Sequence, residues 1–425
     1  MEDLIRILQS CHLDDYQIVQ KETVSHQAFF IKQQLDQHRI NTVTHTKLTV
    51  YVDNEDKSKR GSSTKEIYPQ ETEEEIRQDI ENMKFNALLA MNPYYPLVAK
   101  QTYHEEKEEF DLVDALRNVI SAVQSIEDTA TEKINSYEIF VNRDYIKVVN
   151  SQGVDIAYNK TDEMVEIVIN SLNKDHEVEV YHMIEAGADQ KAEAIRQDIM
   201  EVFKKANDRS KAIPVKKMHK MHVLLSGSDL KEFFNYFADR INTQLIYTGM
   251  SQNKVHEQIQ KGNETDKITL KAVTKLPCSS MNMPYNGEGV KAEDFTVLDN
   301  GEYVNYLGNQ MYSYYLHLPS VNFAGNFIVE GGSKTIAQMK QEPYLDIVQF
   351  SSFQVDVITG DLGGEFRLAY YYDGEKVIPV TAGSITVNMN DILEHMYLSK
   401  ETKQYNNWVV PQTVELFGID VAGQE

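Results

Sequence analysis

The chain has 425 residues, with 42 Lys and Arg against 65 Asp and Glu, so its formal net charge at pH 7 is −23. Such a charge argues against binding to nucleic acid or to an anionic membrane surface, because both interactions use Lys and Arg to neutralise phosphates. Hydrophobic residues make up 41% of the chain, which argues against disorder, and the length allows two or three domains with their own cores.

The N-terminus and the cysteines indicate where the protein works. Residues 1–6 lack the basic-then-apolar order of a signal peptide, and no run of about 18 uncharged apolar residues occurs. We therefore expect a cytoplasmic protein. Cys11 and Cys278 are the only cysteines, so a disulfide framework and a Cys-rich zinc site are excluded.

The N-terminal half is predicted to consist of long strands and helices. Residues 43–52 alternate in the strand manner, and residues 16–31 are expected to pair with them in antiparallel orientation. A helix is predicted at 71–91, with the acidic first turns that the helix dipole favours, and a second at 111–126, which carries one apolar stripe. Further along, we expect strands at 137–149, 154–159, 164–171 and 177–184, a helix at 188–206 and a linker at 208–217.

Glycine placement predicts a different C-terminal half. Twelve of the 20 glycines lie in residues 301–425, whereas residues 1–150 contain only Gly61, so the C-terminal half should be β structure with many tight turns. A short strand at 223–225 leads into a helix that Ser228 or Asp229 can cap. That helix should be buried, since five apolar side chains share one face: Leu230, Phe233, Phe234, Phe237 and Ile241.

The remaining elements complete an α+β protein. Strands are expected at 295–298, 302–307, 345–350, 354–359, 366–372, 376–380 and 412–420, with short helices begun by residues 331–333 and at 390–399. The N-terminal region is thus α/β with long strands and helices, and antiparallel sheet dominates the C-terminal domain. We divide the chain into an N-terminal domain at 1–95, a central domain at 96–212 that can pack with the first as one unit, and a C-terminal domain at 213–425.

Zinc hydrolysis needs two imidazoles on one metal and a nearby carboxylate, which a helical His-Glu-x-x-His motif supplies. Three His-Glu pairs occur, and none has its second histidine at that spacing: they begin at His104, His176 and His256. His219 and His222 lie three residues apart, but Lys216 and Lys217 precede them and oppose a cation. We interpret the two histidines as an exposed pair before a strand, with a weak metal site left open.

The sequence also lacks the usual signatures of a nucleophilic hydrolase and of a nucleotide-binding protein. No Gly-x-Ser-x-Gly segment is present, and Cys278 has no histidine nearby, so we interpret it as an ordinary thiol. In the segment 331–335, Ser333 separates Gly332 from Lys334, whereas a phosphate-binding loop needs Gly and Lys in contact along the chain. This segment is predicted to be a turn with Ser333 as a helix N-cap.

Tyrosines in the glycine-rich half are the candidates for contact with a peptide or a partner. In a strand, alternate side chains share a face, so part of each cluster belongs to the core and part to a surface. The candidate residues, with a nearby turn, are Tyr312, Tyr314, Tyr315, Tyr370, Tyr372, Gly360 and Asp361. The acidic runs at 71–75 and 105–109 are interpreted as solvated helix faces rather than as sites for a basic partner.

Short segments rich in glycine, asparagine and aspartate follow one another in a characteristic order. They include Tyr-Asn-Gly-Glu-Gly-Val at 285–290, and continue at 298–301, 319–326, 331–333, 359–361, 373–375, 383–385 and 416–423. Weaker matches lie at 60–61, in the helix from residue 71, and at 92–93 and 150–154. Over residues 40–425, this order resembles the TldD/PmbA family, whose members are also labelled modulators of DNA gyrase.

The resemblance implies a peptidase complex of two related subunits. The TldD-like subunit carries a His-Glu-x-x-x-His zinc motif on the first helix of its C-terminal domain and a ligating cysteine near its C-terminus. The matching helix here, at 229–240, contains no histidine, and Cys278 is the last cysteine. The chain therefore resembles the PmbA/TldE subunit, which lacks the zinc site, and the resemblance implies no catalytic or metal-binding residue in this chain and zinc only in the partner.

Three hypotheses follow. The leading one is a non-catalytic subunit that pairs with a TldD-like zinc peptidase and helps to enclose unfolded or short peptides. The second is an independent hydrolase with an unrecognised site, such as His219, His222 and distant carboxylates. The third is a homo-oligomeric peptide-binding protein, a homodimer when alone. In the first case, we expect the excess acid on helix faces and an interface nearer to neutral.

Overall fold

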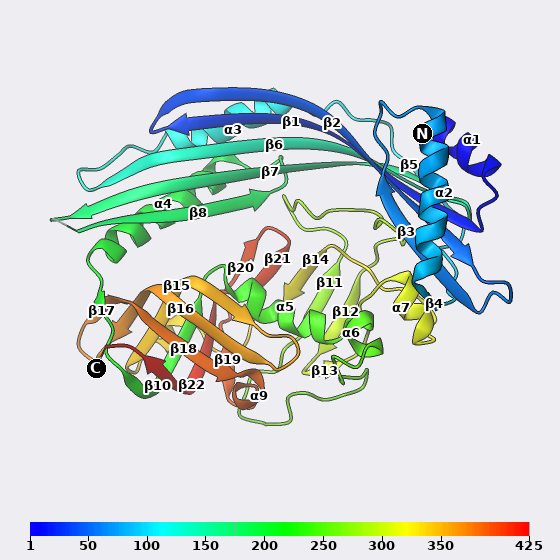
Figure 1. Cartoon of the computed structure of the whole chain (residues 1–425). Helices are drawn as coiled ribbons and strands as arrows, with labels where there is room; N and C mark the ends of the chain where they lie inside the picture. Colours follow the sequence, from blue (N-terminus) through cyan, green and yellow to red (C-terminus); the bar gives the residue numbers. More distant parts are fainter. Residues whose placement is uncertain (175, 425) are drawn as a thin grey trace.

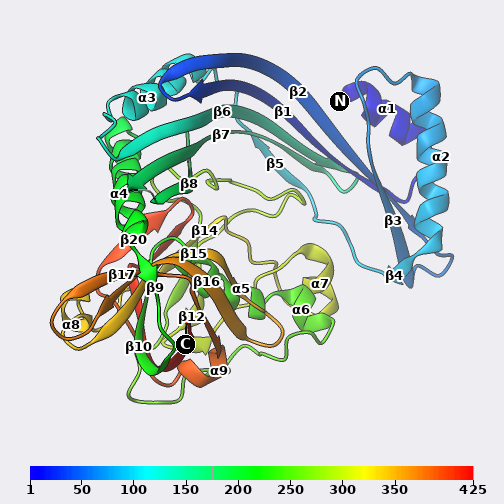
Figure 2. The same cartoon turned by 60° about the vertical axis from the view of Figure 1, so that its left-hand side comes forward.

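The computed structural model describes residues 1–174 and 176–424. It is an α+β protein, as predicted, with an N-terminal part (residues 1–210) built on one eight-stranded sheet and a C-terminal part (residues 213–424) that holds two further sheets. The long strands of the first sheet form a curved layer above the C-terminal part (Figure 1), and a turned view shows this layer as an arch (Figure 2).

The N-terminal sheet has the strand order β4-β3-β2-β1-β6-β7-β5, with β8 paired to β7. Its strands are β1 (Asp15–Ile31), β2 (Gln34–Asp53), β3 (Lys59–Glu66), β4 (Met91–Pro93), β5 (Gln101–His104), β6 (Glu132–Asn150), β7 (Val154–Asn173) and β8 (His176–Ala186). The predicted antiparallel pairing is confirmed, with Ile18 opposite Leu48. The two strands predicted at 154–159 and 164–171 are one strand, because residues 160–163 between them continue the pairing with β6.

Four helices accompany this sheet: α1 (Glu2–Ser10), α2 (Glu73–Leu89), α3 (Leu112–Gln124) and α4 (Ala192–Ser210). Thr72 and Glu75 form a capping box at the start of α2. The apolar stripes of α3 and α4 pack on the sheet in one buried cluster, which includes Val119, Ile199 and Ile167. The linker predicted at 208–217 is wrong, because α4 continues to Ser210 and residues 213–214 form strand β9.

The first C-terminal sheet closes into a barrel. Its order is β15-β10-β22-β18-β16, and β15 also pairs with β16, while β17, β9 and β19 extend it. The strands are β9 (Ile213–Pro214), β10 (Met218–Ser226), β15 (Tyr344–Val355), β16 (Asp361–Tyr372), β17 (Val377–Thr381), β18 (Gly383–Asn388), β19 (Met396–Leu398) and β22 (Thr413–Ala422). The strand predicted at 345–350 extends to Val355 as β15, whose pairing with β16 continues past register shifts. The strand predicted at 354–359 is wrong for residues 356–359, which lie in the turn before β16.

The second C-terminal sheet has the order β13-β12-β11-β14-β21-β20. Its strands are β11 (Leu270–Val273), β12 (Phe295–Asp299), β13 (Glu302–Tyr303), β14 (Asn326–Val329), β20 (Thr402–Tyr405) and β21 (Trp408–Pro411). Helix α5 (Leu230–Arg240) is buried with this sheet and the barrel in one core, and Phe233, Phe234 and Phe237 are fully buried, as predicted. Asp229 occupies its N-cap position, although the side chain makes no capping hydrogen bond.

The short helices differ most from the predictions. They are α6 (Thr243–Tyr247), α7 (Gln310–Tyr315), α8 (Ile336–Met339) and α9 (Met389–Ile392). Thr335, not Ser333, caps α8, because Thr335 shares a capping box with Gln338 while the Ser333 N–H donates to Asp266. The helix predicted at 390–399 ends at Ile392, since residues 396–398 pair with β22 as β19.

No helix within residues 1–174 and 176–424 is both long enough and apolar enough to cross a membrane.

Candidate functional site

The predicted tyrosines of residues 312–315 lie on helix α7, at a contact between the two parts of the chain. The Tyr315 hydroxyl donates to the Pro93 carbonyl, and its ring meets that of Tyr95 edge-on at 6.0 Å. Burial raises the pKa of Tyr315. Tyr312 packs against Tyr315 at 6.0 Å, whereas Tyr314 is exposed. Tyr315 therefore holds α7 against the N-terminal part, and Tyr314 faces solvent.

The predicted tyrosines of β16 have separate environments. The Tyr370 hydroxyl donates to Asp208 Oδ2 of α4 at 2.6 Å, and burial together with this bond raises its pKa. The Tyr372 hydroxyl donates to the Gly374 carbonyl at 2.9 Å, within its own turn, and its ring lies 5.5 Å from that of Tyr344. Tyr370 thus joins the two parts of the chain, and Tyr372 does not.

Gly360 and Asp361 form the turn between β15 and β16. Gly360 has a φ of +77°, which favours glycine. Asp361 accepts hydrogen bonds from the Thr359 hydroxyl and from the Asn388 amide, both at 2.9 Å. These contacts shape the turn. The structure does not bring the α7, β16 and turn residues into one site, and their contact with a peptide stays a prediction.

His219 and His222 differ in exposure. His219 is exposed, 3.4 Å from Asp420, but His222 is not: its side chain is 13% exposed, and its Nε2 lies 2.9 Å from Glu415 Oε1. The Phe417 ring stacks on His222 at 4.9 Å, and Lys334 binds the other oxygen of Glu415. Burial acts to raise the pKa of Glu415, but its bonds to His222 and Lys334 outweigh burial and lower it. The prediction of an exposed pair is therefore wrong for His222, which belongs to a buried charge cluster.

The donor set of α5 does not fit a zinc ion. Residues 231–236 are Lys-Glu-Phe-Phe-Asn-Tyr, so Lys231 and Tyr236 stand where a His-Glu-x-x-x-His motif has imidazoles. An ammonium group is not a metal ligand, and burial raises the pKa of the Tyr236 phenol, which keeps it protonated. Throughout the described part of the chain, no group of three or more His, Cys, Asp or Glu side chains is placed to hold a metal ion.

One stripe of α4 carries contacts between the two parts of the chain, which we call the α4 seam. The helix contributes four residues at spacings of three or four, which share one face: Asp198, Glu201, Lys205 and Asp208. Lys403 Nζ of β20 donates to Asp198 Oδ1 at 3.2 Å and to Glu201 Oε2 at 3.0 Å. At the other end, the bond from Tyr370 to Asp208 ties α4 to the barrel.

Lys205 lies between these two contacts without a partner. No carboxylate oxygen of the described residues lies within 4.0 Å of its ammonium group, and the same holds for Lys231 of α5. Both side chains are half-buried. Burial lowers the pKa of Lys205. The nearby positive charge of Lys403 lowers it further, whereas the negative charges of Glu201 and Asp229 act to raise it. The seam therefore contains positive charges that it does not neutralise by direct pairing.

The groups around Lys205 share its electrostatic environment. Burial and the charges of Lys205 and Lys403 lower the pKa of the His182 imidazole of β8 to about 4, so His182 is neutral at pH 7. Burial raises the pKa of Asp229, although a backbone hydrogen bond from Phe350 and the charge of Lys205 oppose this. Burial also raises the pKa of Tyr405, to about 12. A neutral imidazole and a protonated phenol thus accompany the unpaired lysines.

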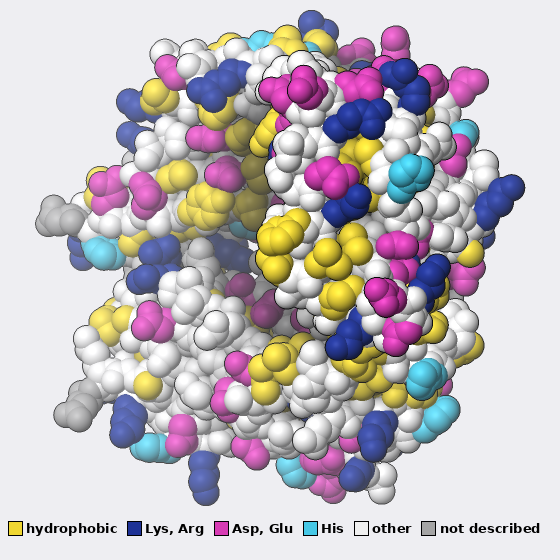
Figure 3. All heavy atoms as spheres, turned by 45° about the vertical axis from the view of Figure 1, so that its right-hand side comes forward, with side chains coloured by type: hydrophobic (Ala, Val, Ile, Leu, Met, Phe, Trp, Pro, Cys, Tyr) yellow, Lys and Arg dark blue, Asp and Glu magenta, His cyan; other side chains and the backbone are white. Residues whose placement is uncertain are grey.

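Two strand edges lie at the α4 seam. Within the described residues, β8 pairs only with β7, and β20 pairs only with β21, so each leaves one side free for main-chain hydrogen bonds. His182 belongs to β8, and Lys403 and Tyr405 belong to β20. Figure 3 shows that the molecule is deeply hollowed between its upper and lower parts, with acidic side chains inside the hollow.

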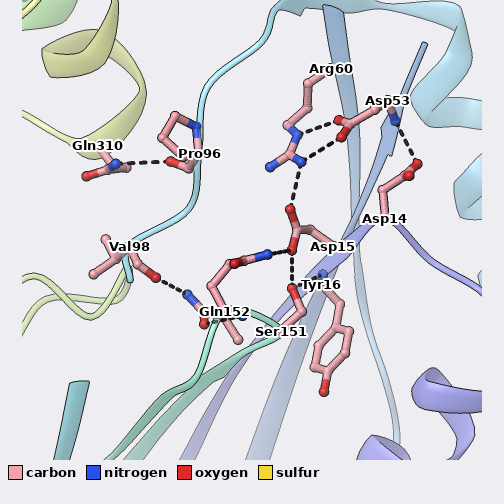
Figure 4. A network of polar contacts seen from close by, with 11 residues as sticks. Asp14, Asp15, Tyr16, Asp53, Arg60, Pro96, Val98, Ser151, Gln152 and Gln310 are labelled. Atoms are coloured by element: carbon pink, nitrogen blue, oxygen red, sulfur yellow. Dashed lines mark hydrogen bonds and ion pairs between the residues drawn. The ribbon is translucent and has the colours of Figure 1, made fainter. Parts of the chain in front are cut away.

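A second polar network lies within the N-terminal part, near the segment at residues 93–96 that contacts α7 (Figure 4). Arg60 donates to Asp53 at 2.6 and 2.9 Å and to Asp15 at 2.7 Å. Asp15 also accepts hydrogen bonds from Ser151 and Gln152. All three charged side chains are at most 5% exposed. Burial acts to lower the pKa of Arg60, but the bonds to Asp53 and Asp15 outweigh burial and raise it.

Comparison with known proteins agrees with this architecture. Residues 218–423 match the family model of the PmbA/TldA metallopeptidase C-terminal domain. Among curated proteins, no sequence matches. The fold is that of TldE from Thermococcus kodakarensis, with a TM-score of 0.78, 15% identity and 100% of both chains covered.

Two further solved structures share the fold, and both are named as candidate modulators of DNA gyrase. The one from Thermotoga maritima has a TM-score of 0.76 and 16% identity, with 99% of each chain covered. The one from Bacteroides thetaiotaomicron has a TM-score of 0.80 and 14% identity, over 99% of this chain and 98% of the other. The fold and the matched domain define a metallopeptidase-like protein. Residues 218–423 carry the C-terminal domain of the TldD/PmbA family, and the chain as a whole has the fold of TldE.

The α4 seam was not predicted from the sequence. The spacing of Asp198, Glu201, Lys205 and Asp208 is visible as a polar stripe on the predicted helix and could have indicated a buried polar contact. Its partners Lys403 and Tyr370 lie 205 and 162 residues from Asp198 and Asp208 along the chain. No local pattern connects residues over such separations.

Proposed function

We propose that this chain is a non-catalytic, PmbA/TldE-like subunit of a TldD/PmbA-type metallopeptidase complex, and that it pairs with a TldD-like zinc subunit to cleave unfolded or short peptides. The observation that carries the proposal is the composition of α5, where Lys231 and Tyr236 stand at the positions of zinc-binding imidazoles. The chain has kept the fold of the family, but this helix cannot bind the metal on which hydrolysis depends.

The strand edges support a role in holding peptide. An extended peptide can add to a free edge through main-chain hydrogen bonds, which tolerate varied side chains. The edge strands β8 and β20 both contact helix α4, and they belong to different parts of the chain. A peptide held there would lie in the region between the arch and the C-terminal part. The zinc would be supplied by the partner.

An exposed apolar surface on α2 is our candidate for the contact with the TldD-like subunit. Phe85, Leu88 and Leu89 share one face of the helix and are 63%, 52% and 70% exposed. Figure 3 shows hydrophobic side chains gathered beside the hollow, on the side of the molecule where α2 lies. A subunit bound to this surface would close the hollow from outside, and an uncharged contact avoids the repulsion that an acidic chain would otherwise meet.

The central experiment compares the lone protein with the protein co-expressed with a TldD-like subunit from the same genome. We expect the lone protein to lack stoichiometric zinc and peptidase activity on an unstructured peptide, and the co-purified pair to have both. Metal analysis and a peptidase assay give the answer. Stoichiometric zinc or activity in the lone protein would overturn the proposal.

The α2 surface is tested in the same co-expression experiment. The substitution Leu89→Glu should prevent co-purification of the zinc subunit, because it places a charge in an apolar contact. The matched control is Ile40→Glu on β2, where the isoleucine is 59% exposed. Loss of pairing in both variants, or in neither, would reject the α2 surface as the interface.

The pair formed by His222 and Glu415 is the observation that favours the alternative of an independent hydrolase. That alternative predicts activity of the lone protein that disappears in His222→Ala, and an unchanged rate would eliminate it. Sedimentation tests the remaining alternative: a stable homodimer, with no zinc subunit co-purified from the native cell, would favour a homo-oligomeric peptide-binding protein.

A further inference from the structure

The C-terminal part contains a cavity of about 460 Å³ between helix α5, helix α9 and the segment at 252–261. This volume lies in the range of small-molecule sites. Three apolar or aromatic side chains form part of its wall: Ile259, Tyr303 and Leu393. Helix α9 lies on the side of the C-terminal part away from the arch (Figure 1, Figure 2). The cavity is therefore apart from the region between the arch and the C-terminal part, where we expect peptide.

Arg240 of α5 lines this cavity with a guanidinium group that is held in place on one side. Its Nε donates to Asn253 Oδ1 at 2.7 Å, and its Nη1 donates to the carbonyls of Val357 and Ile358, both at 3.1 Å. Its other terminal nitrogen, Nη2, donates to no residue that the structure describes, and no carboxylate oxygen of those residues lies within 4.0 Å of the guanidinium. A fixed, half-buried cation is thus left without a counter-charge, and it can bind an anionic group.

The same asparagine orients a carboxylate of the cavity wall. Asn253 Nδ2 donates to Glu257 Oε2 at 3.2 Å, and the Lys254 N–H donates to the same oxygen at 2.9 Å. Among the described residues, no group donates to the other oxygen, Oε1. One amide therefore holds the guanidinium of Arg240 and the carboxylate of Glu257 on its two sides. The free Nη2 and the free Oε1 form a positive and a negative group that are separated by a single amide.

Tyr236 adds a hydrogen-bond donor beside Arg240. The central guanidinium carbon of Arg240 lies 5.9 Å from the centroid of the Tyr236 ring, and Tyr236 itself lines the cavity and is 7% exposed. Its hydroxyl has no hydrogen-bond partner in the part of the chain that the structure describes. Burial raises the pKa of Tyr236, so the phenol is protonated at pH 7 and can donate to a carboxylate.

We propose that this cavity binds a free α-amino acid with an apolar side chain. Arg240 and Tyr236 hold its carboxylate, Glu257 holds its ammonium group, and Ile259 and Leu393 contact its side chain. In such a ligand the two charged groups are attached to one carbon, which suits a cation and an anion that one amide keeps side by side. The site goes beyond the proposed function, because it needs neither zinc nor a partner subunit.

The charges in the cavity wall favour a zwitterion over a simple anion or cation. Two basic residues, Arg240 and Lys261, face two acidic ones, Glu257 and Glu394. Glu394 is already engaged, because its carboxylate accepts the backbone N–H groups of Lys261 and Gly262. A simple anion would leave Glu257 without a partner, and a simple cation would leave Arg240 without one. An amino acid neutralises both.

Isothermal titration calorimetry of the full-length lone protein at pH 7 tests the site. The first probe is L-leucine, whose side chain suits the apolar wall. L-leucinamide lacks the carboxylate, isocaproate lacks the ammonium group, and the dipeptide glycyl-L-leucine has its two charges further apart. We expect L-leucine to bind with a Kd of about 1 mM or below. Each of the other three compounds should bind at least about tenfold more weakly.

Two substitutions connect this preference to the cavity. Tyr236→Phe removes a hydroxyl that no described residue uses, and Glu257→Gln keeps an oxygen for its two present donors. Each should weaken the binding of L-leucine about tenfold, and Glu257→Gln should also remove most of the preference for L-leucine over isocaproate. Arg240 is left unchanged, because its substitution would also release the carbonyls of residues 357 and 358.

The matched controls are Tyr68→Phe and Glu293→Gln, at exposed positions outside the cavity. Both should bind L-leucine like the wild type. The proposal is overturned by absence of L-leucine binding at about 10 mM, by equal affinity for L-leucine and its analogues, or by tighter binding of the dipeptide. An equal loss in the cavity variants and in the controls would overturn it as well.

Two readouts keep this site distinct from the proposed function. The thermal midpoints of Tyr236→Phe and Glu257→Gln should equal that of the wild type, which shows that both variants fold. Binding of L-leucine by a protein that never pairs with a zinc subunit would reject the proposed function and leave the site in place. Pairing and peptidase activity without binding of L-leucine would reject the site alone.

Discussion

Two groups of buried or half-buried charges are built differently. The Arg60 group lies within the N-terminal part, whereas the α4 seam joins the N-terminal part to the C-terminal part. In the Arg60 group, one guanidinium meets two aspartates and neighbouring side chains donate to Asp15. At the α4 seam, Lys403 is paired in a similar way, but Lys205 and Lys231 are not. A fully paired group stabilises the fold, whereas a group with unpaired charges leaves part of the cost of burial without compensation.

The two groups also differ in how burial affects the pKa of their cations. Around Arg60, hydrogen bonds outweigh burial and raise its pKa, so the charge is secure. Around Lys205, burial prevails and lowers the pKa. The same chain thus stabilises one buried cation and leaves another unsatisfied. This contrast is the reason to expect a larger contribution to folding stability from Arg60 than from Lys205.

The largest effect is expected at Arg60. Substitution Arg60→Met leaves Asp15 and Asp53 buried without their counter-charge, which should lower the free energy of unfolding by about 3–5 kcal/mol. Urea denaturation measures this change. The control is Arg77→Met, which removes an exposed pair with Glu73 and should cost less than about 1 kcal/mol. Similar losses in both variants would show that the Arg60 group has no special structural role.

A smaller effect, dependent on pH, is expected at Glu163 of β7, which is 2% exposed with neither oxygen hydrogen-bonded within the described residues. Burial, with the charge of Asp189, raises the pKa of Glu163 to about 8 from 4.5. As the pH rises, the unfolded chain loses this proton first. The stability contribution is therefore complete below pH 4.5 and is lost as the pH rises towards 8.

The change between these pH values should amount to about 2–4 kcal/mol. Urea denaturation between the two pH values should show this fall for the wild type, and Glu163→Gln should remove most of the slope. Glu193→Gln, at an exposed position of α4, should leave the slope as it is. An unaltered slope in Glu163→Gln would mean that other groups cause the pH dependence.

The next effect concerns the turn at Gly360, where φ is +77°. Substitution Gly360→Ala forces a side chain into the left-handed region, which should cost about 1–2 kcal/mol of unfolding free energy. A Cβ at Gly363 would meet only ordinary contacts, 3.7 Å from the Ile385 carbonyl oxygen, so Gly363→Ala is the control. Thermal denaturation of the two variants should rank them in this order, and the reverse order would contradict the assignment.

The smallest effect compares two tyrosines on one strand. Tyr370→Phe removes the bond to Asp208 across the seam, with an expected cost of about 1 kcal/mol. Tyr372→Phe removes only a bond within its own exposed turn and should cost less than about 0.5 kcal/mol. Hydrogen exchange of α4 should increase in the first variant alone. Equal hydrogen exchange of α4 in both variants would show that the bond from Tyr370 to Asp208 does not hold α4 in place.

The sequence predicted the regular elements best. Long alternation identified the strands of the N-terminal sheet, and one apolar stripe identified each of α3 and α4. Predictions failed where a short local contact decided the structure. No element was predicted for the tyrosines at 312–315, which form helix α7, and the Asn309 side chain caps this helix by accepting a hydrogen bond from the N–H of Tyr312 at 3.0 Å.

The candidate site was predicted only in part. The absence of histidine from α5 is visible in the sequence, and Tyr370 was a candidate for contact with a peptide or a partner. The structure shows that its hydroxyl joins α4 to the barrel, and contact with a peptide stays a prediction. Lys205 was not a candidate, because a lysine on a helix is usually solvated and only the positions of Lys403 and Tyr370 reveal that it is enclosed.

The helix α4 also sets a limit on how this gene can change in length. Its contacts to β20 and β16 depend on residues ten positions apart, from Asp198 to Asp208. One residue inserted between Glu201 and Lys205 would turn everything after it by about 100° and shift it by about 1.5 Å. Asp208 would then leave Tyr370, although every contact before the insertion would be kept. Substitutions within α4 can be absorbed one at a time, whereas insertions and deletions there would separate the two parts of the protein.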